Sequence, residues 1–192
     1  MTDTKDKKYE LIKEDSIKVN GYTLYRIKAL KSFGMVKEGI IGGYIEKEEN
    51  LSHKGIAWVY DNAMVFGNAM VFGNAIICDD AWLCENARVY DNAMVYGNAK
   101  VFGNTKIYDH ALVHDNAIVY DYAMVFGNAR VFGNGMVFGN AKIYDRAKVY
   151  NHARVFGNGM VSVNAKIYDR AKVYGDVCVS GNTCICGDRE LY

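Results

Sequence analysis

A six-residue repeat runs through the chain from residue 57 onwards. It begins with Ala57-Trp-Val-Tyr-Asp-Asn62 and continues without insertion or deletion to Asp188, which makes 22 hexads. The third position is always Val, Ile or Leu, and the first is Ala in 17 of the 22 hexads. A period of six fits neither an α-helix nor a heptad coiled coil, but it fits a short strand followed by a turn. The repeat therefore predicts stacked coils of β-strands.

The alternation within each hexad predicts which side chains point inward. In a strand, positions one and three share one side and positions two and four share the other. Nine hexads carry Lys or Arg at position two, and a buried column of unpaired cations would be very costly. We therefore predict that the Ala and Val residues face inward. The fourth position, aromatic in 16 of 22 hexads, is predicted to face outward.

The last two positions of each hexad are predicted to form a corner. Position five is mostly Gly, Asp or Glu, and position six is Asn in 14 hexads. Asn is the non-glycine residue that best tolerates a positive φ, so we expect it to occupy the bend. Three hexads would close a triangular coil. The predicted fold is all-β, a single-stranded parallel β-solenoid of about seven coils.

The spacing of aliphatic and small residues resembles the hexapeptide repeat of left-handed β-helix proteins. A left-handed coil is implied by this resemblance alone, because general crossover rules favour the right hand. The Val-Phe-Gly-Asn-Ala-Met units are similar, more narrowly, to those of bacterial and phage β-solenoid proteins. Residues 24–30, 42–46 and 50–53 resemble the segment that precedes the repeats in those proteins.

The chain divides into three predicted regions. Residues 1–56 lack the repeat, and the segment from Ser16 to Leu30 has the pattern of a hairpin around an Asn20-Gly21 turn. We expect this region to be a small β-rich cap, because an open solenoid end exposes apolar residues and strand edges. Residues 57–188 are the predicted β-helix. Residues 189–192 are a predicted tail, which leaves an open end as a candidate contact surface.

Composition gives few signs of a membrane, a metal or a cofactor. The net charge is +1, the first residues are polar, and no run of about 18 apolar residues occurs. We expect a soluble protein of the bacterial cytoplasm, with no membrane partner and no cofactor. The five cysteines are an odd number, which favours reduced thiols. Cys178, Cys184 and Cys186 lack an evident fourth ligand for a metal.

Many left-handed hexapeptide proteins are trimeric acyltransferases, so the resemblance implies an enzymatic alternative. Such enzymes use a histidine to deprotonate the acceptor, and this chain has four, His53, His110, His114 and His152. Nothing in the sequence marks one of them as a catalytic base, and we expect solvent-exposed structural roles for all four. The repeat contains no inserted loop of the kind those enzymes carry, and we expect no additional C-terminal element. We therefore predict no catalytic residues.

The predicted outer surface carries aromatic stripes and an uneven charge. Residues 57–129 hold 3 basic and 8 acidic side chains, whereas residues 130–173 hold 8 basic and 2 acidic ones. Only in the second region do aromatic stripes coincide with a net charge of +6, which is typical of an interface or of a platform for single-stranded nucleic acid. The candidate partner-binding residues are Arg130, Phe132, Lys148, Tyr150, Arg154, Phe156, Lys166, Tyr168, Lys172 and Tyr174.

These observations predict a non-enzymatic solenoid that binds a macromolecule through its flat sides. The partner would be a protein or a nucleoprotein complex, with direct nucleic-acid binding and homo-oligomer formation as further options. The resemblance to phage solenoids implies a sharper version, an inhibitor of a host defence complex such as an anti-CRISPR protein. A hexapeptide-repeat acyltransferase and a self-assembling structural rod are the two alternatives.

Overall fold

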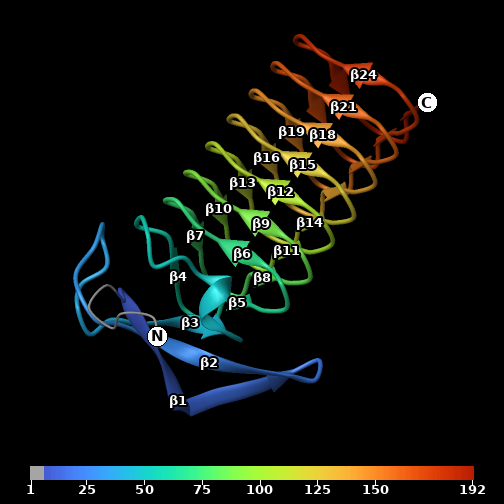
Figure 1. Cartoon of the computed structure of the whole chain (residues 1–192). Coiled ribbons are helices and arrows are strands. Elements are labelled where there is room, and N and C mark those ends of the chain that lie inside the picture. Colours follow the sequence, from blue (N-terminus) through green and yellow to red (C-terminus); the bar gives the residue numbers. More distant parts are fainter. Residues whose placement is uncertain (1–6) are drawn as a thin grey trace.

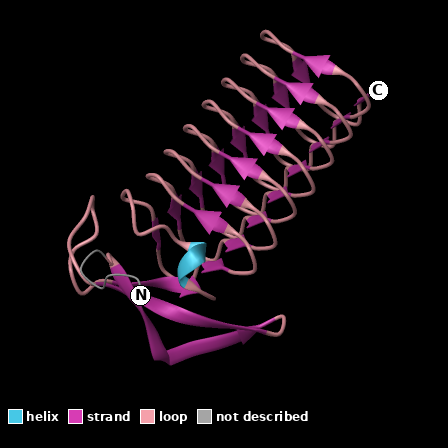
Figure 2. Ribbon diagram, viewed as in Figure 1, coloured by secondary structure: helices cyan, strands magenta, loops and turns pink. Residues whose placement is uncertain are grey.

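The computed structural model describes residues 7–192 and consists almost entirely of β-strands (Figures 1 and 2). Each hexad contributes one two-residue strand, formed by positions two and three, and then turns a corner. Three hexads complete one coil, and each strand pairs in parallel with the strand of the next coil, as in Met94 with Leu112. The predicted all-β parallel solenoid is confirmed. Its left hand remains a prediction.

The stacked strands form three sheets along the rod. The eight-stranded sheet contains β4 (Trp58–Val59), β7 (Ile76–Ile77), β10 (Met94–Val95), β13 (Leu112–Val113), β16 (Arg130–Val131), β19 (Lys148–Val149), β22 (Lys166–Ile167) and β25 (Cys184–Ile185). The seven-stranded sheet contains β6 (Met70–Val71), β9 (Arg88–Val89), β12 (Lys106–Ile107), β15 (Met124–Val125), β18 (Lys142–Ile143), β21 (Met160–Val161) and β24 (Cys178–Val179).

The third sheet has eleven strands because the N-terminal region extends it. Its solenoid strands are β5 (Met64–Val65), β8 (Trp82–Leu83), β11 (Lys100–Val101), β14 (Ile118–Val119), β17 (Met136–Val137), β20 (Arg154–Val155), β23 (Lys172–Val173) and β26 (Glu190–Leu191). Its first three strands are β1 (Tyr9–Val19), β2 (Tyr22–Ala29) and β3 (Ile41–Ile45). One turn of 3₁₀ helix, η2 (Glu48–Asn50), follows β3.

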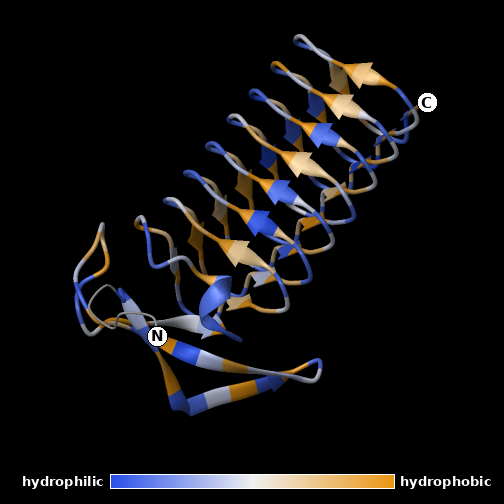
Figure 3. Cartoon of the chain, in the orientation of Figure 1, coloured by the Kyte–Doolittle hydropathy of each residue, from blue (hydrophilic) through white to orange (hydrophobic). Residues whose placement is uncertain are grey.

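The interior follows the predicted parity. Inward residues such as Val119 and Ile143 are fully buried, and the Ala residues of position one are buried beside them. Position two points outward and varies freely, so the arrows of β9, β12 and β18 are hydrophilic in Figure 3 whereas those of β6 and β15 are hydrophobic. The core therefore depends on two of the six positions, and the outer positions are left to vary.

The corners correct one prediction. The positive φ lies at position five, as in Asp61 (52°) and Gly103 (75°), and the Asn residues of position six do not adopt it. These Asn side chains instead form ladders between coils, for example from Asn68 Nδ2 to Asn86 Oδ1 at 3.2 Å. Acidic residues at position five accept a hydrogen bond from the next coil, as Glu85 does from the Gly103 amide at 2.9 Å. Asn suits this ladder because its side-chain amide donates one hydrogen bond and accepts another.

The N-terminal region covers the first coil. Strands β1 and β2 form the predicted hairpin, with positive φ at both Asn20 and Gly21, which is the geometry of a tight hairpin turn. Strand β3 then pairs antiparallel with β2 and parallel with β5, so the cap continues a solenoid sheet (Figure 1). Beneath it, Trp58 is fully buried although it occupies an outward position of the repeat.

Aromatic and basic side chains fill the space between the cap and the first coil. Tyr9 and Phe33 lie edge-on to Trp58, at centroid distances of 6.1 and 5.4 Å. Lys8 is buried, and its Nζ donates a 2.7 Å hydrogen bond to the Ala57 carbonyl. Burial, followed by the nearby Lys31, lowers the pKa of Lys8 to about 8. The cap thus holds a lysine whose charge is costly at neutral pH.

The opposite end of the rod differs from the prediction as well. Glu190 and Leu191, expected to lie in a tail, form β26 and pair with Lys172 and Val173 of β23. Arg189 stands where the repeat has a small residue at position one, so residues 189–192 do not match the repeat in sequence although they continue the coil. Among residues 7–192, no helix has the length and hydropathy needed to cross a membrane.

Candidate binding surface

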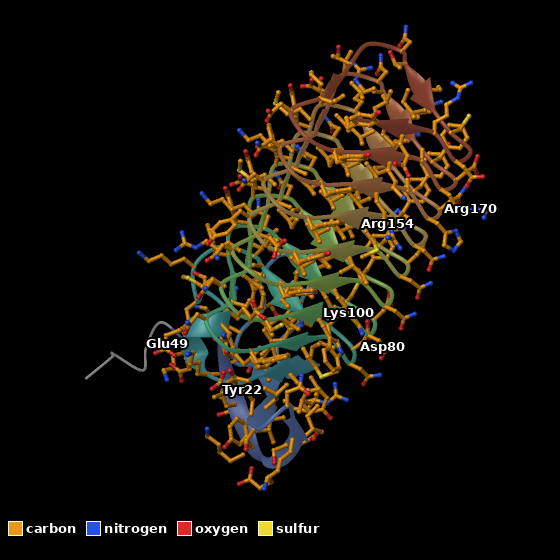
Figure 4. The ribbon with its side chains drawn as sticks, turned by 90° about the vertical axis from the view of Figure 1, so that its right-hand side faces the viewer. Tyr22, Glu49, Asp80, Lys100, Arg154 and Arg170 are labelled. Atoms are coloured by element: carbon orange, nitrogen blue, oxygen red, sulfur yellow. The ribbon has the colours of Figure 1, made fainter. Side chains whose placement is uncertain are left out.

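The ten predicted binding residues lie on two faces of the rod. Six lie on or directly after strands of the eight-stranded sheet and four on or directly after strands of the eleven-stranded sheet, with a corner between the two groups. Figure 4 shows Arg154 and Lys100 on the same face of the rod. Arg170 lies at the edge of the rod in this view. The six on the eight-stranded sheet are Arg130, Phe132, Lys148, Tyr150, Lys166 and Tyr168. The four on the eleven-stranded sheet are Arg154, Phe156, Lys172 and Tyr174.

Among residues 7–192, three cations in consecutive coils occur only on the eight-stranded sheet, whereas the other two sheets reach pairs, Arg88 with Lys106 and Arg154 with Lys172. Arg130 pairs in register with Lys148, and Lys148 pairs with Lys166. We call these three residues the basic column. Arg130 and Lys166 are exposed and Lys148 is half-buried. Neighbouring strands are about 4.8 Å apart. The three positive charges of the basic column are therefore close enough to repel one another.

The basic column has no acidic partner among residues 7–192 with which it forms an ion pair. The eleven-stranded sheet differs, because Lys172 Nζ lies 2.7 Å from Glu190 Oε1. Glu190 also accepts a hydrogen bond of 3.1 Å from the Tyr174 hydroxyl, and these contacts lower the pKa of Glu190. That face is therefore partly neutralised, and the basic column is the stronger attraction for an anion.

A fourth cation extends the basic column around the corner. Arg130 and Lys148 line a groove of about 440 Å³ together with Asn128 and Arg146. Arg146 occupies position six, where most hexads carry Asn, and it was not among the predicted binding residues. A departure from Asn at that position was the available signal. The groove brings three cationic side chains to one concave site.

Aromatic rings stand beside the basic column in one continuous stack, which we call the aromatic ladder. Its rings are parallel to within 9°, with centroid distances of 4.7 to 5.1 Å between successive coils. The ladder consists of Tyr96, His114, Phe132, Tyr150 and Tyr168. Each inner ring is covered on both faces by its neighbours, so ring edges and not ring faces meet the solvent. Ring edges carry partial positive charge.

The titration of the ladder leaves its phenols neutral. Burial, followed by Cys184, raises the pKa of Tyr150, and a hydrogen bond to Cys186 raises that of Tyr168 to about 12. Both hydroxyls therefore keep their protons at neutral pH. They add no negative charge beside the basic column.

The outward residues of the same sheet change character toward the N-terminus. Leu112 is the register neighbour of Arg130, and Met94 and Ile76 follow it in the preceding coils. All three apolar side chains are partly exposed. One flat face thus presents an apolar half and a basic half in sequence.

The histidines do not converge on one site. His110 and His152 are exposed at corners, and His152 Nε2 lies 3.4 Å from Asn134 Nδ2. His114 Nδ1 lies 3.2 Å from Asp115 Oδ1 while the ring joins the ladder. His53 and His114 correct the expectation of exposure, because both are half-buried: His53 stacks on Tyr9 at 4.3 Å inside the cap, and His114 is stacked between Tyr96 and Phe132.

The cysteines are all free thiols. Burial raises the pKa of Cys78 and of Cys84 to about 11, which favours the protonated and less reactive form. Among the described residues, no group of His, Cys, Asp and Glu has the arrangement of a metal site.

The comparisons with known proteins concern the repeat. Residues 87–104, which make up one complete coil, match the YdcK β-solenoid repeat. No curated protein matches the chain. Over that coil the chain is similar to the YdcK repeat, and its fold is that of a β-helix protein.

Proposed function

We propose that this solenoid is a non-enzymatic binding protein that recognises an acidic surface of another macromolecule. The observation that carries the proposal is the basic column, three in-register cations with no ion-pair partner among residues 7–192. Unpaired cations on a rigid sheet give a favourable binding free energy with an anionic partner, because the sheet is already ordered and no further ordering of the backbone is needed. Arg and aromatic residues are also the side chains that dominate interface energies.

An acidic protein surface suits this site better than single-stranded nucleic acid. Bases bind to such platforms by stacking on exposed aromatic faces. In the aromatic ladder the faces of His114, Phe132 and Tyr150 are occupied by neighbouring rings. Carboxylates, by contrast, can contact both the cations and the positively polarised ring edges. The resemblance to phage solenoids extends the proposal to an inhibitor of a host defence complex.

The test is a charge reversal on the outer surface. The variant Arg130→Glu/Lys148→Glu/Lys166→Glu leaves the Val and Ala core intact, so its circular dichroism and melting temperature should match the wild type. Its affinity for fluorescent poly-L-glutamate, measured by anisotropy, should fall at least about 100-fold, or roughly 2.7 kcal/mol. Wild-type affinity should also decrease as salt is added.

The chain offers a matched control with the same change in net charge. Arg88→Glu/Lys100→Glu/Lys106→Glu alters three position-two cations that lie on two sheets and outside the basic column. This control should retain most of the binding. An equal loss in both variants would mean that overall charge, and not this surface, attracts the ligand. Unchanged binding in the first variant would refute the proposal.

A further inference from the structure

The strongest unexplained feature is the apolar half of the eight-stranded sheet. Ile76, Met94 and Leu112 are in register, partly exposed, and continuous with the basic column through the pairing of Leu112 with Arg130. We call these three residues the apolar strip. A soluble protein gains nothing from exposing such a row next to an unpaired row of cations. One ligand that covers both rows would satisfy both.

We propose that the eight-stranded sheet binds one acidic amphipathic polypeptide segment along the axis of the rod. The apolar end of the segment would lie over the apolar strip and its carboxylates over the basic column. This inference rests on the proposed function, and it adds the chemistry and the order of the ligand.

Charge complementarity fixes that order. The corners that flank the apolar strip carry exposed carboxylates, among them Asp79, Asp91 and Asp115. These would repel acidic residues at the apolar end of the ligand. The cations of the basic column attract them at the other end, and Arg146 adds a further donor in the groove. Acidic residues scattered evenly along the segment would therefore bind less well than the same residues gathered at one end.

The length of the ligand follows from the repeat. The two rows span six consecutive coils from Ile76 to Lys166, or about 24 Å at ~4.8 Å per coil. An α-helix of about 16 residues covers this distance. A polynucleotide of that length would place its phosphates beside the acidic corners of the apolar half, where it would be repelled. The surface therefore favours a polypeptide.

The experiment compares three fluorescent 16-residue peptides. One has Leu-Ala repeats in its first half and Glu-Ala repeats in its second, one has the same composition with Leu and Glu alternating, and one contains Glu and Ala only. The wild-type protein should bind the two-block peptide at least about 10-fold more tightly than the alternating one. The Glu-Ala peptide measures the basic column alone.

Two variants test whether the apolar strip itself, and not exposed apolar residues in general, gives the preference for the two-block peptide. In Ile76→Ser/Met94→Ser/Leu112→Ser, the preference for the two-block peptide should disappear, while binding of the Glu-Ala peptide stays unchanged. The matched control is Met64→Ser/Ile118→Ser/Met136→Ser, which alters outward apolar residues of the eleven-stranded sheet. It should keep the preference. Melting curves verify that both variants are folded.

The outcomes distinguish this inference from the proposed function. Equal affinity for the two-block and alternating peptides would overturn the inference, yet the proposed function would stand if the Glu-Ala peptide still required Arg130, Lys148 and Lys166. If the preference for the two-block peptide is absent and binding of the Glu-Ala peptide does not depend on the basic column, both the inference and the proposed function are refuted. A 16-nucleotide single-stranded DNA that binds more tightly than the two-block peptide would overturn the choice of a polypeptide.

Discussion

The N-terminal and C-terminal halves of the solenoid have the same interior and opposite exteriors. In both halves the buried columns are Ala with Val, Ile or Leu, and the strands pair in the same register. Outside, residues 57–129 carry an excess of acidic side chains and residues 130–173 an excess of basic ones. Fold and surface chemistry are thus specified by different positions of the hexad, so one can change without the other.

The largest expected effect tests the sameness of the interiors. Val119→Asp in the first half and Ile143→Asp in the second each bury a carboxylate at a site that is 0% exposed. Both variants should lose more than about 4 kcal/mol of stability, because the charge has no partner in the column. Urea unfolding followed by circular dichroism measures the loss. If one of the two variants remained folded while the other unfolded, the interiors of the two halves would not be equivalent.

The corners allow a second comparison between positions with equal φ and unequal surroundings. Gly103 has φ +75° and a Cβ there would lie 2.6 Å from the Asp121 amide nitrogen, whereas Gly181 has φ +73° and nothing within 4 Å. Gly181→Ala should cost roughly 1–2 kcal/mol from backbone strain alone. Gly103→Ala should cost clearly more in the same unfolding assay. Equal costs would mean that coils slide apart easily to relieve the contact.

The capped end differs from the regular coils because it contains a buried lysine. The pKa of Lys8 lies at about 8, below its usual 10.5, so between these values the native state holds fewer protons than the unfolded state. Stability should therefore rise with pH from about 8, by at most about 1.4 kcal/mol per pH unit. Below pH 8 the full cost of the buried charge is present.

The control for this pH dependence is Lys8→Met. Chemical unfolding at pH 7.5, 8.5 and 9.5 should give a larger increase for wild type than for the variant. The difference between the two proteins matters, because Cys78 and Cys84 act in the opposite direction above pH 9, where the native state retains their protons. Parallel curves would show that the amine is charged and solvated in the folded protein.

The smallest expected effect concerns the outward rings. Tyr120→Ser in the first half and Tyr144→Ser in the second each remove one ring from a stack, where neighbouring centroids lie 4.8 to 5.1 Å away. Tyr120→Ser removes two stacked pairs and should cost up to about 2 kcal/mol, and Tyr144→Ser removes one pair and should cost up to about 1 kcal/mol, because cross-strand aromatic pairs contribute some tenths to about 1 kcal/mol each. Thermal melts should rank both far below the core variants. A loss as large as that of Val119→Asp would contradict the inward and outward assignment.

Several details could not be read from the repeat because they depend on neighbouring coils. The Asn amides pair with residues 18 positions away, as Asn74 does with Asn92 at 3.1 Å, whereas a hexad taken by itself predicts a positive φ for Asn. Likewise Trp58 has an outward position and is buried only because the cap covers it. The division of the ten predicted binding residues between two faces, by contrast, follows from three hexads per coil and could be read from the repeat.

The sequence alone determined the architecture, because a strict period of six with a branched residue at the third position of every hexad leaves one compact solution, a stacked parallel coil. It also determined the parity, since a column of cations can only face the solvent. The tertiary structure decided which charges are neutralised. Glu190 forms an ion pair with Lys172 because β26 adds a strand that the repeat did not predict, whereas the basic column has no such acidic neighbour among residues 7–192. The ion pair of Lys172 with Glu190 joins residues of neighbouring coils. Such residues are 18 positions apart in the sequence and come into contact only when the coils stack.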